Sequence, residues 1–317
     1  MEFLVNDLSM EGQFHDLRAF EEAVGRIMTL REQLRRDGYS LHCNRGLASA
    51  RVTPQHLMQQ AVHRLPQAAR RAWMQWLTQF GPHWEDDRLH DGDDWLEVDG
   101  EIVTDSAVGE AAACAARGLE RDLVSFQPSS WLTTPIDVRW VRDDGMADDI
   151  SVPNHWDVDS IARSLRGRPR PVTSWAELAV RSVARCSRLT FSDDAFVPLQ
   201  GQPFSPGAAE RIRVLLNTLD RMKGCFHEDG TRTCEGHRLY QDHFTGDKAW
   251  FSDSSDTEKR QFRNALTFAC PGRPAESLFC TWHGKVKTPQ YRIHFSWPIC
   301  ADGPLYVVYV GPKITRR

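Results

Sequence analysis

The segment CTWHGKVKTPQYRIHFSWPI, residues 280–299, concentrates side chains that can hold phosphate groups and move protons. Two histidines and three cations alternate with other residues in it: His283, Lys285, Lys287, Arg292 and His294. Lysine and arginine bind phosphate through charge and hydrogen bonds, and histidine exchanges a proton near neutral pH. Side chains two residues apart on a strand share one face. If the strands that carry these residues pair antiparallel, a cationic sheet face results.

Three interpretations of that face stay open. One face of an antiparallel sheet is commonly polar because it meets water, so the face can be a plain solvated surface. Its cations can instead contact phosphates, and Lys313 and the terminal Arg316 and Arg317 extend the basic set. The histidines can also take part in catalysis by transferring protons.

Strands near the end of the chain must position these side chains. Alternation of apolar and polar residues predicts three of them, over 278–287, 290–299 and 305–311. A helix is predicted to begin at Ser205-Pro206 and end at Gly224, since proline fits the first helical turn. The capping box from Ser255 to Glu258 predicts the start of another helix. We therefore expect a C-terminal antiparallel β-meander packed on helices.

The rest of the chain divides by its pattern into two further regions. Apolar residues at helical spacing, around residues 13–37 and 53–80, predict a helical N-terminal region over 1–82. Residues 83–200 mix helix and strand signals and include an acidic loop, and residues 201–317 form the C-terminal module. Regular alternation of strand and helix is missing, so the predicted fold class is α+β. The stretch RGRPRP, residues 166–171, is the most linker-like part of the sequence.

Composition indicates an ordinary globular protein. Of 317 residues, 41% are hydrophobic and 26% charged, and no apolar run reaches the ~18 residues that a membrane helix needs. The first residues, MEFLVNDLSMEG, lack a basic stretch followed by an apolar one, so no secretory signal is expected. The eight cysteines show no CxxC spacing and are expected to be reduced thiols, which predicts a cytoplasmic location without membrane contact. Motifs for nucleotide hydrolysis, dinucleotide binding, serine hydrolases and HExxH zinc enzymes are absent from the sequence.

Charge is distributed unevenly along the chain. The net charge is −4, yet residues 85–110 hold eleven acidic side chains against one arginine, and residues 280–317 hold six basic side chains against one aspartate. The acidic segment can be a solvated loop, a surface that binds a basic partner or imitates DNA, or a site for a divalent cation. The cation ligands would be Asp93, Asp94, Glu97 and Glu101.

A zinc site is one interpretation of CFHEDGTRTCEGH, residues 225–237. The four nitrogen and sulfur ligands would be Cys225, His227, Cys234 and His237. Tetrahedral zinc takes four such ligands, although this spacing is not that of a standard zinc finger. The alternative is a hairpin with its tip at Glu228-Asp229-Gly230, flanked by cysteines that are small buried residues. We expect no cofactor unless this zinc site forms.

The last forty residues, LFCTWHGKVKTPQYRIHFSWPICADGPLYVVYVGPKITRR, resemble the β-meander that ends toxins of the RelE/ParE superfamily. The shared features are a strand with an arginine, a turn, a last apolar strand and a basic terminal cluster. Members of that superfamily are mRNA interferases or gyrase poisons, and Arg292, His294 and Lys313 would match their functional positions. The remaining chain departs from the family, whose members are far smaller. As a whole, with FTGDKAWFSDSSDTEK, it resembles accessory or effector proteins of bacterial anti-phage defence loci.

These resemblances and the residue pattern give two functional hypotheses. The first is a bacterial toxin-type or antiviral defence protein whose C-terminal module engages nucleic acid, DNA or RNA, as a metal-independent ribonuclease. The catalytic candidates are His283, His294, Arg292 and Lys285. The nucleic-acid-binding candidates are Lys287, Lys313, Arg316 and Arg317. The second hypothesis is a noncatalytic subunit that docks a partner ATPase or nuclease through its acidic segment and helps to hold DNA.

Overall fold

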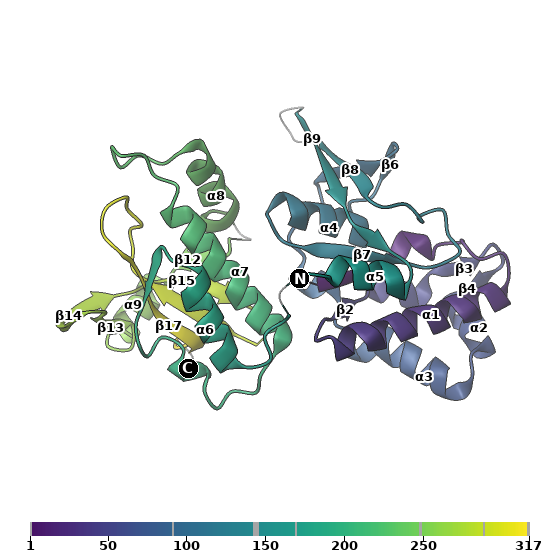
Figure 1. The fold of residues 1–317 in the computed structure, drawn as a ribbon, viewed down its shortest axis with the longest axis horizontal. Coiled ribbons are helices and arrows are strands. Elements are labelled where there is room, and N and C mark those ends of the chain that lie inside the picture. The colour runs from purple at the N-terminus through teal and green to yellow at the C-terminus, as the bar shows by residue number, and fades with distance from the viewer. Residues whose placement is uncertain are drawn as a thin grey trace. The chain divides into compact units, whose positions relative to one another are not determined.

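The computed structural model describes residues 2–90, 92–141, 146–168, 170–246, 249–287 and 289–315. The chain forms two compact units, an N-terminal unit of residues 1–171 and a C-terminal unit of residues 172–317 (Figure 1). The boundary directly follows the linker-like stretch 166–171. There are thus two units where three regions were expected. Each unit is described by itself.

A four-stranded parallel sheet forms the centre of the N-terminal unit. Its order is β10-β7-β1-β2. The strands are β1 (Glu2–Asn6), β2 (Leu41–His42), β7 (Arg121–Ser125) and β10 (Asn154–His155). Parallel sheets are covered on both faces. Accordingly, Phe3 and Val5 of β1 enter one hydrophobic core and Leu4 enters another.

Helices build the first of these two cores. They are α1 (Leu17–Arg36), α2 (Met58–Ala61), α3 (Gln67–Gln75) and α5 (Val158–Leu165). Asp16 caps α1 by accepting a hydrogen bond from the Ala19 N–H at 2.8 Å, and the predicted apolar stripe of α1 is buried, from Phe20 to Leu34. The region over 1–82, predicted to be helical, contains α1, α2 and α3 but also the strands β1 and β2. The apolar run in β1 is only three residues long, Phe3 to Val5, too short for periodicity to separate strand from helix.

The helical pattern predicted over 53–80 does not begin as a helix at Thr53. The Thr53 hydroxyl accepts hydrogen bonds from the backbone N–H groups of Gln55 and His56, at 3.2 and 3.1 Å, and so closes a turn. That turn joins β3 (Arg51–Thr53) to β4 (His56–Leu57), an antiparallel pair. Helix α2 begins after it, at Met58.

A second sheet of the N-terminal unit is antiparallel, in the order β6-β5-β8-β9. Its strands are β5 (Trp95–Val98), β6 (Glu101–Ile102), β8 (Ile136–Val141) and β9 (Ala147–Val152). A hairpin turn at Asp99-Gly100 joins β5 to β6, and both residues have the positive φ that a tight hairpin turn requires. Helix α4 (Ala107–Ala116) packs into the core beneath this sheet.

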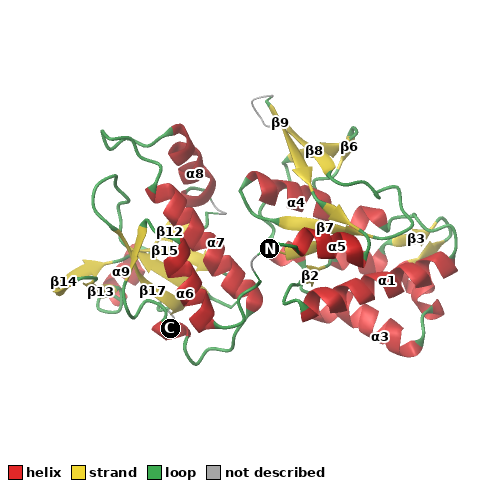
Figure 2. Ribbon diagram, in the orientation of Figure 1, coloured by secondary structure: helices red, strands yellow, loops and turns green. Residues whose placement is uncertain are grey.

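A five-stranded sheet forms the C-terminal unit, in the order β11-β17-β16-β15-β12. Its strands are β11 (Leu189–Phe191), β12 (Phe251–Asp253), β15 (Trp282–Val286), β16 (Tyr291–Phe295) and β17 (Leu305–Pro312). The β12, β15, β16 and β17 neighbours pair antiparallel, and β11 pairs with β17 in parallel. The helices are α6 (Trp175–Arg185), α7 (Pro206–Lys223), α8 (Cys234–Phe244) and α9 (Asp256–Gln261). Figure 2 shows α6 and α7 lying across one face of this sheet.

A short hairpin stands beside that sheet. It consists of β13 (Thr267–Cys270) and β14 (Arg273–Phe279), which pair with each other. The single strand predicted over 278–287 is therefore two strands, because β14 ends at Phe279 and β15 begins at Trp282. The fold class is α+β, as expected. Among the described residues, no helix combines the length and the apolar character that crossing a membrane would take.

Candidate nucleic-acid interface

The strands β15 and β16 pair antiparallel and bring the predicted residues together. Lys285 lies opposite Arg292, and His283 lies opposite His294. Cross-strand partners point to the same face of a sheet. The other face is the core face, because a side chain at Gly284 would meet Phe251 and the α7 residue Leu215. The expected face of Lys, Arg and His therefore forms on the side of the sheet away from α7.

The two histidines on this face are buried. His283 and His294 lie with their ring centroids 5.3 Å apart. Nδ1 of His294 is 3.0 Å from the carbonyl oxygen of Cys280, and Nδ1 of His283 is 3.3 Å from that of Thr281. A carbonyl only accepts, so Nδ1 carries the proton in both rings and, in the neutral imidazole, Nε2 keeps its lone pair.

Burial changes the protonation of both histidines. It lowers the pKa of His283 to about 4, with the charge of Arg292 adding to the effect. It lowers the pKa of His294 to about 3, and the neighbouring His283 contributes. Both rings are therefore neutral at neutral pH, whereas the sequence suggested groups that titrate there. A neutral ring can accept a proton, but neither histidine holds an extra one to donate.

Aromatic side chains cover the histidine end of the face. The ring of Phe268, in β13, lies 6.0 Å from that of His294 and 6.1 Å from that of Tyr309. Tyr309 in turn lies opposite His294 in β17, with 5.7 Å between the rings. The sequence-based interpretation missed both aromatic residues. Tyr309 follows from the alternation of the last strand, but nothing local to Phe268 indicates its contact.

The cationic end of the face is more open. Lys287 is exposed, and Lys285 and Arg292 are half-buried. Arg292 donates from Nη1 to the backbone carbonyls of Tyr291 and Val286, at 2.8 and 3.2 Å, which holds its guanidinium beside the strand pair. Desolvation, and then the charges of Arg292 and Lys287, lower the pKa of Lys285. Within the described part of the chain, no carboxylate forms an ion pair with Lys285 or Lys287.

Lys313 has a different environment from these lysines. Its Nζ lies 3.2 Å from Oε1 of Glu258, in α9, and the Thr315 hydroxyl donates to the same oxygen at 2.7 Å. The hydrogen bond from Thr315, with those from Ser255 and Lys313, lowers the pKa of Glu258 to about 2. Glu258 also completes the predicted capping box with Ser255. Lys313 is thus neutralised within the chain, and the candidates Arg316 and Arg317 lie outside the described residues.

The zinc ligands proposed from the sequence do not come together. Among the described residues, no group of three or more histidine, cysteine, aspartate or glutamate side chains could hold a metal ion. Cys225 is buried, whereas Cys234 and His237 are exposed at the start of α8. His227 donates its backbone N–H to the Thr231 carbonyl at 2.8 Å, which closes the predicted hairpin around Gly230. Among the described residues, Asp93, Asp94, Glu97 and Glu101 do not form such a group either.

A second cluster of buried ionisable groups lies in the N-terminal unit. His90 and Glu110 are fully buried, with Nδ1 of His90 2.7 Å from a Glu110 oxygen. Arg121 bonds to Glu110 and, at 2.8 Å, to Glu2. Burial would raise the pKa of Glu110, but the His90 hydrogen bond and the Arg121 charge hold it below its ordinary value. In this cluster, which the sequence did not reveal, every buried charge faces an opposite one.

Comparison with known proteins adds no assignment: no family model, curated protein or solved structure matches the chain. The resemblance of the last forty residues to RelE/ParE toxins therefore stays a prediction.

Proposed function

We propose that the C-terminal unit binds the phosphate backbone of nucleic acid through Lys285, Lys287 and Arg292. One observation carries the proposal: Lys285 is half-buried beside Arg292 and Lys287 and forms no ion pair in the described part of the chain. A cation withdrawn from water without an anion is costly, and a phosphate group that docks there would relieve the cost. The lowered pKa of Lys285 expresses the same imbalance.

The arrangement of the cations favours a polyanion over a single phosphate ion. Lys287 follows Lys285 by two residues, just after β15 ends at Val286. Arg292 stands opposite Lys285 on the neighbouring strand, about 5 Å away. The three charges therefore spread over a surface instead of converging on one point. Such a row suits successive phosphates of a nucleic-acid strand.

Binding is better supported than cleavage. The ribonuclease hypothesis needs a base and an acid, and the buried His283 and His294 are neutral until the pH falls to about 4 and about 3. A noncatalytic role in holding DNA or RNA for a partner protein agrees with these pKa values. The role in bacterial defence or toxicity is our proposal from the resemblance of the last forty residues and of the whole chain.

The test is nucleic-acid binding by the full chain across a salt series. Labelled single-stranded RNA, single-stranded DNA and duplex DNA are titrated by fluorescence anisotropy between 50 and 200 mM salt, the range in which phosphate contacts respond strongly. The wild type should bind with a steep dependence of log affinity on log salt. The Lys285→Gln/Lys287→Gln variant should bind more weakly, with a slope smaller by about 1.5, because each lost contact removes about 0.7 to 0.9.

Two single variants serve as controls. Lys313→Gln removes a cation that Glu258 already neutralises, and Arg238→Gln removes an exposed cation of α8. Neither should change the slope by as much as Lys285→Gln alone. If the wild type does not bind at 50 mM salt, or if the double variant keeps the wild-type slope, the proposal is wrong. Cleavage is assayed on the same labelled RNA, and cleavage lost in His283→Gln with binding intact would restore the ribonuclease hypothesis.

A further inference from the structure

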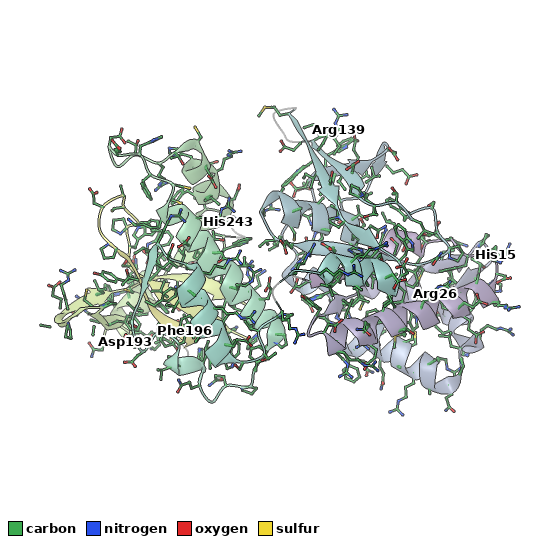
Figure 3. The ribbon with its side chains drawn as sticks, in the orientation of Figure 1. His15, Arg26, Arg139, Asp193, Phe196 and His243 are labelled. Atoms are coloured by element: carbon green, nitrogen blue, oxygen red, sulfur yellow. The ribbon has the colours of Figure 1, made fainter. Side chains whose placement is uncertain are left out.

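The antiparallel sheet of the N-terminal unit has one covered face and one open face. The covered face contributes Leu96, Ile136, Val138 and Val152 to the core that includes α4. The open face can be read from the strand register. Its rows are Trp95, Val141 and Ala147; then Ile102, Glu97, Arg139 and Asp149; then Asp137 and Ser151. Figure 3 shows Arg139 projecting outward from this part of the unit.

Two large apolar side chains are exposed on the open face. Trp95 is 52% exposed and Ile102 is 64% exposed. Ile102 pairs with Glu97, two residues from Trp95, so the two apolar side chains are diagonal neighbours within reach of one ligand. Trp95 is also held in place, since its Nε1 donates to a Glu97 oxygen at 2.9 Å. Single exposed apolar residues are common, but a fixed tryptophan beside an exposed isoleucine is a typical anchor of an interface.

Carboxylates surround these apolar residues. On the open face and its rim they are Asp93, Asp94, Glu97, Asp99, Asp137 and Asp149. Arg139 lies on the same face, with its Nη1 atom 3.9 Å from Oε1 of Glu97. The surface therefore repels phosphate groups, and among the described residues its carboxylates do not gather into a metal site. A ligand with positive charge and an apolar side chain fits both features.

We propose that this open face is a docking site for a basic segment of a partner protein, with a large apolar side chain of the partner packed on Trp95 and Ile102. The competing explanation is that the carboxylates only keep the exposed strands soluble and unpaired. That explanation gives the two apolar residues no role. The proposal requires charge and apolar contact to act together, which makes the two explanations distinguishable.

The test measures binding of a defined probe to the full chain. The probe is a fluorescein-labelled twelve-residue peptide of lysine and arginine that contains two leucines, compared with the same peptide carrying serines at those positions. Binding is followed by fluorescence anisotropy at low and at physiological salt. The wild type should bind the leucine peptide at least about tenfold more tightly than the serine peptide, because only leucine can use the apolar part of the site.

Two variants and one matched control separate the contributions. Asp137→Asn/Asp149→Asn should weaken binding of both peptides about tenfold. Trp95→Thr/Ile102→Thr should weaken only the leucine peptide and so abolish its advantage. Asp193→Asn/Asp242→Asn makes the same charge change at exposed positions of the C-terminal unit and should change binding less than twofold (Asp193 is labelled in Figure 3). Circular dichroism verifies that each variant is folded.

Three results would overturn the proposal. One is a wild type that does not bind the leucine peptide. Another is a control variant that loses as much affinity as Asp137→Asn/Asp149→Asn, since binding would then follow net charge alone. The third is an unchanged preference for the leucine peptide in Trp95→Thr/Ile102→Thr.

Discussion

The two units bury ionisable side chains in opposite ways. In the N-terminal unit, His90 and Arg121 both contact Glu110, so the buried charges compensate each other. In the C-terminal unit, His283 and His294 lie beside Lys285 and Arg292, and the described part of the chain supplies no carboxylate partner for Lys285. The first arrangement is complete within the protein and is structural. The second lacks negative charge, and we infer that a ligand provides it.

The largest effect is expected when the compensated cluster is broken. Glu110→Gln leaves the buried Arg121 without one of its two carboxylates and His90 without its charged partner. Removing one member of a buried ionic group costs about 3–5 kcal/mol. We therefore expect the free energy of unfolding of the N-terminal unit, measured in urea, to fall by that amount.

Glu101→Gln is the control for this change, because Glu101 is exposed on β6. Exposed substitutions of this kind usually change stability by less than about 0.5 kcal/mol. Equal unfolding midpoints for Glu110→Gln and Glu101→Gln would contradict the assignment of Glu110 as the centre of a structural cluster.

An intermediate effect is expected from acid on the C-terminal unit. The pKa of His283 falls from 6.5 to about 4 on folding, so between these pH values the unfolded chain binds a proton that the folded chain does not. Stability is therefore lost as pH falls through that window. From pH 7 to pH 5 the loss is on the order of 2 kcal/mol for such a histidine.

The measurement is urea unfolding at pH 7, 6 and 5, with wild type and His283→Gln compared at each pH. The variant should lose less stability than the wild type over this range, whatever its stability at pH 7. Asp7, in the N-terminal unit, should have the opposite effect on the pH dependence of stability, because burial raises the pKa of its carboxyl to about 6. The contribution of Asp7 to folding stability is present at low pH and is lost as pH rises through about 6. Parallel pH dependences for wild type and His283→Gln would show that His283 is not the responsible group.

The smallest effect on stability is expected where the charge is uncompensated. Lys285→Met removes a half-buried cation that has no ion pair in the described part of the chain. The free energy of unfolding should therefore change by less than about 1 kcal/mol, or rise. Nucleic-acid affinity should fall at the same time. Lys313→Met is the comparison, since it leaves Glu258 without its lysine and should lower stability without a matching loss of affinity. If Lys285→Met were strongly destabilised, Lys285 would be a structural residue like Arg121. The proposed difference between the two units would then be wrong.

Strand pairing near the end of the chain could be predicted because it depends on local alternation. Arg292 and His294 alternate with Ile293 and Phe295, and this pattern alone orients the whole of β16. The parallel sheet of the N-terminal unit could not be predicted in the same way. Its outer strands β2 and β10 have two residues each, and β1 finds its partner β7 more than a hundred residues later.

The chemistry of the site was less predictable than its position. The sequence identified the side chains that share the face, but their protonation depends on burial by the β13–β14 hairpin, through Phe268. The pairing of Lys313 with Glu258 depends on where α9 packs. Both are long-range contacts without a local signal. The half-buried Lys285 lies opposite Arg292, as the alternation predicted, and the exposed Lys287 follows two residues later. The function of these cations stays a proposal.

The place of β17 in its sheet has a consequence for synthesis. This strand is the last described element of the chain, yet it lies between β11 and β16. On the ribosome the N-terminal unit can fold as soon as residues 1–171 have emerged. The C-terminal sheet cannot close until Leu305–Pro312 has been made, because β11 has no other strand partner among the described residues. The sheet that carries the basic face is therefore completed only by the last described strand, whereas the strands of the acidic sheet end at Val152.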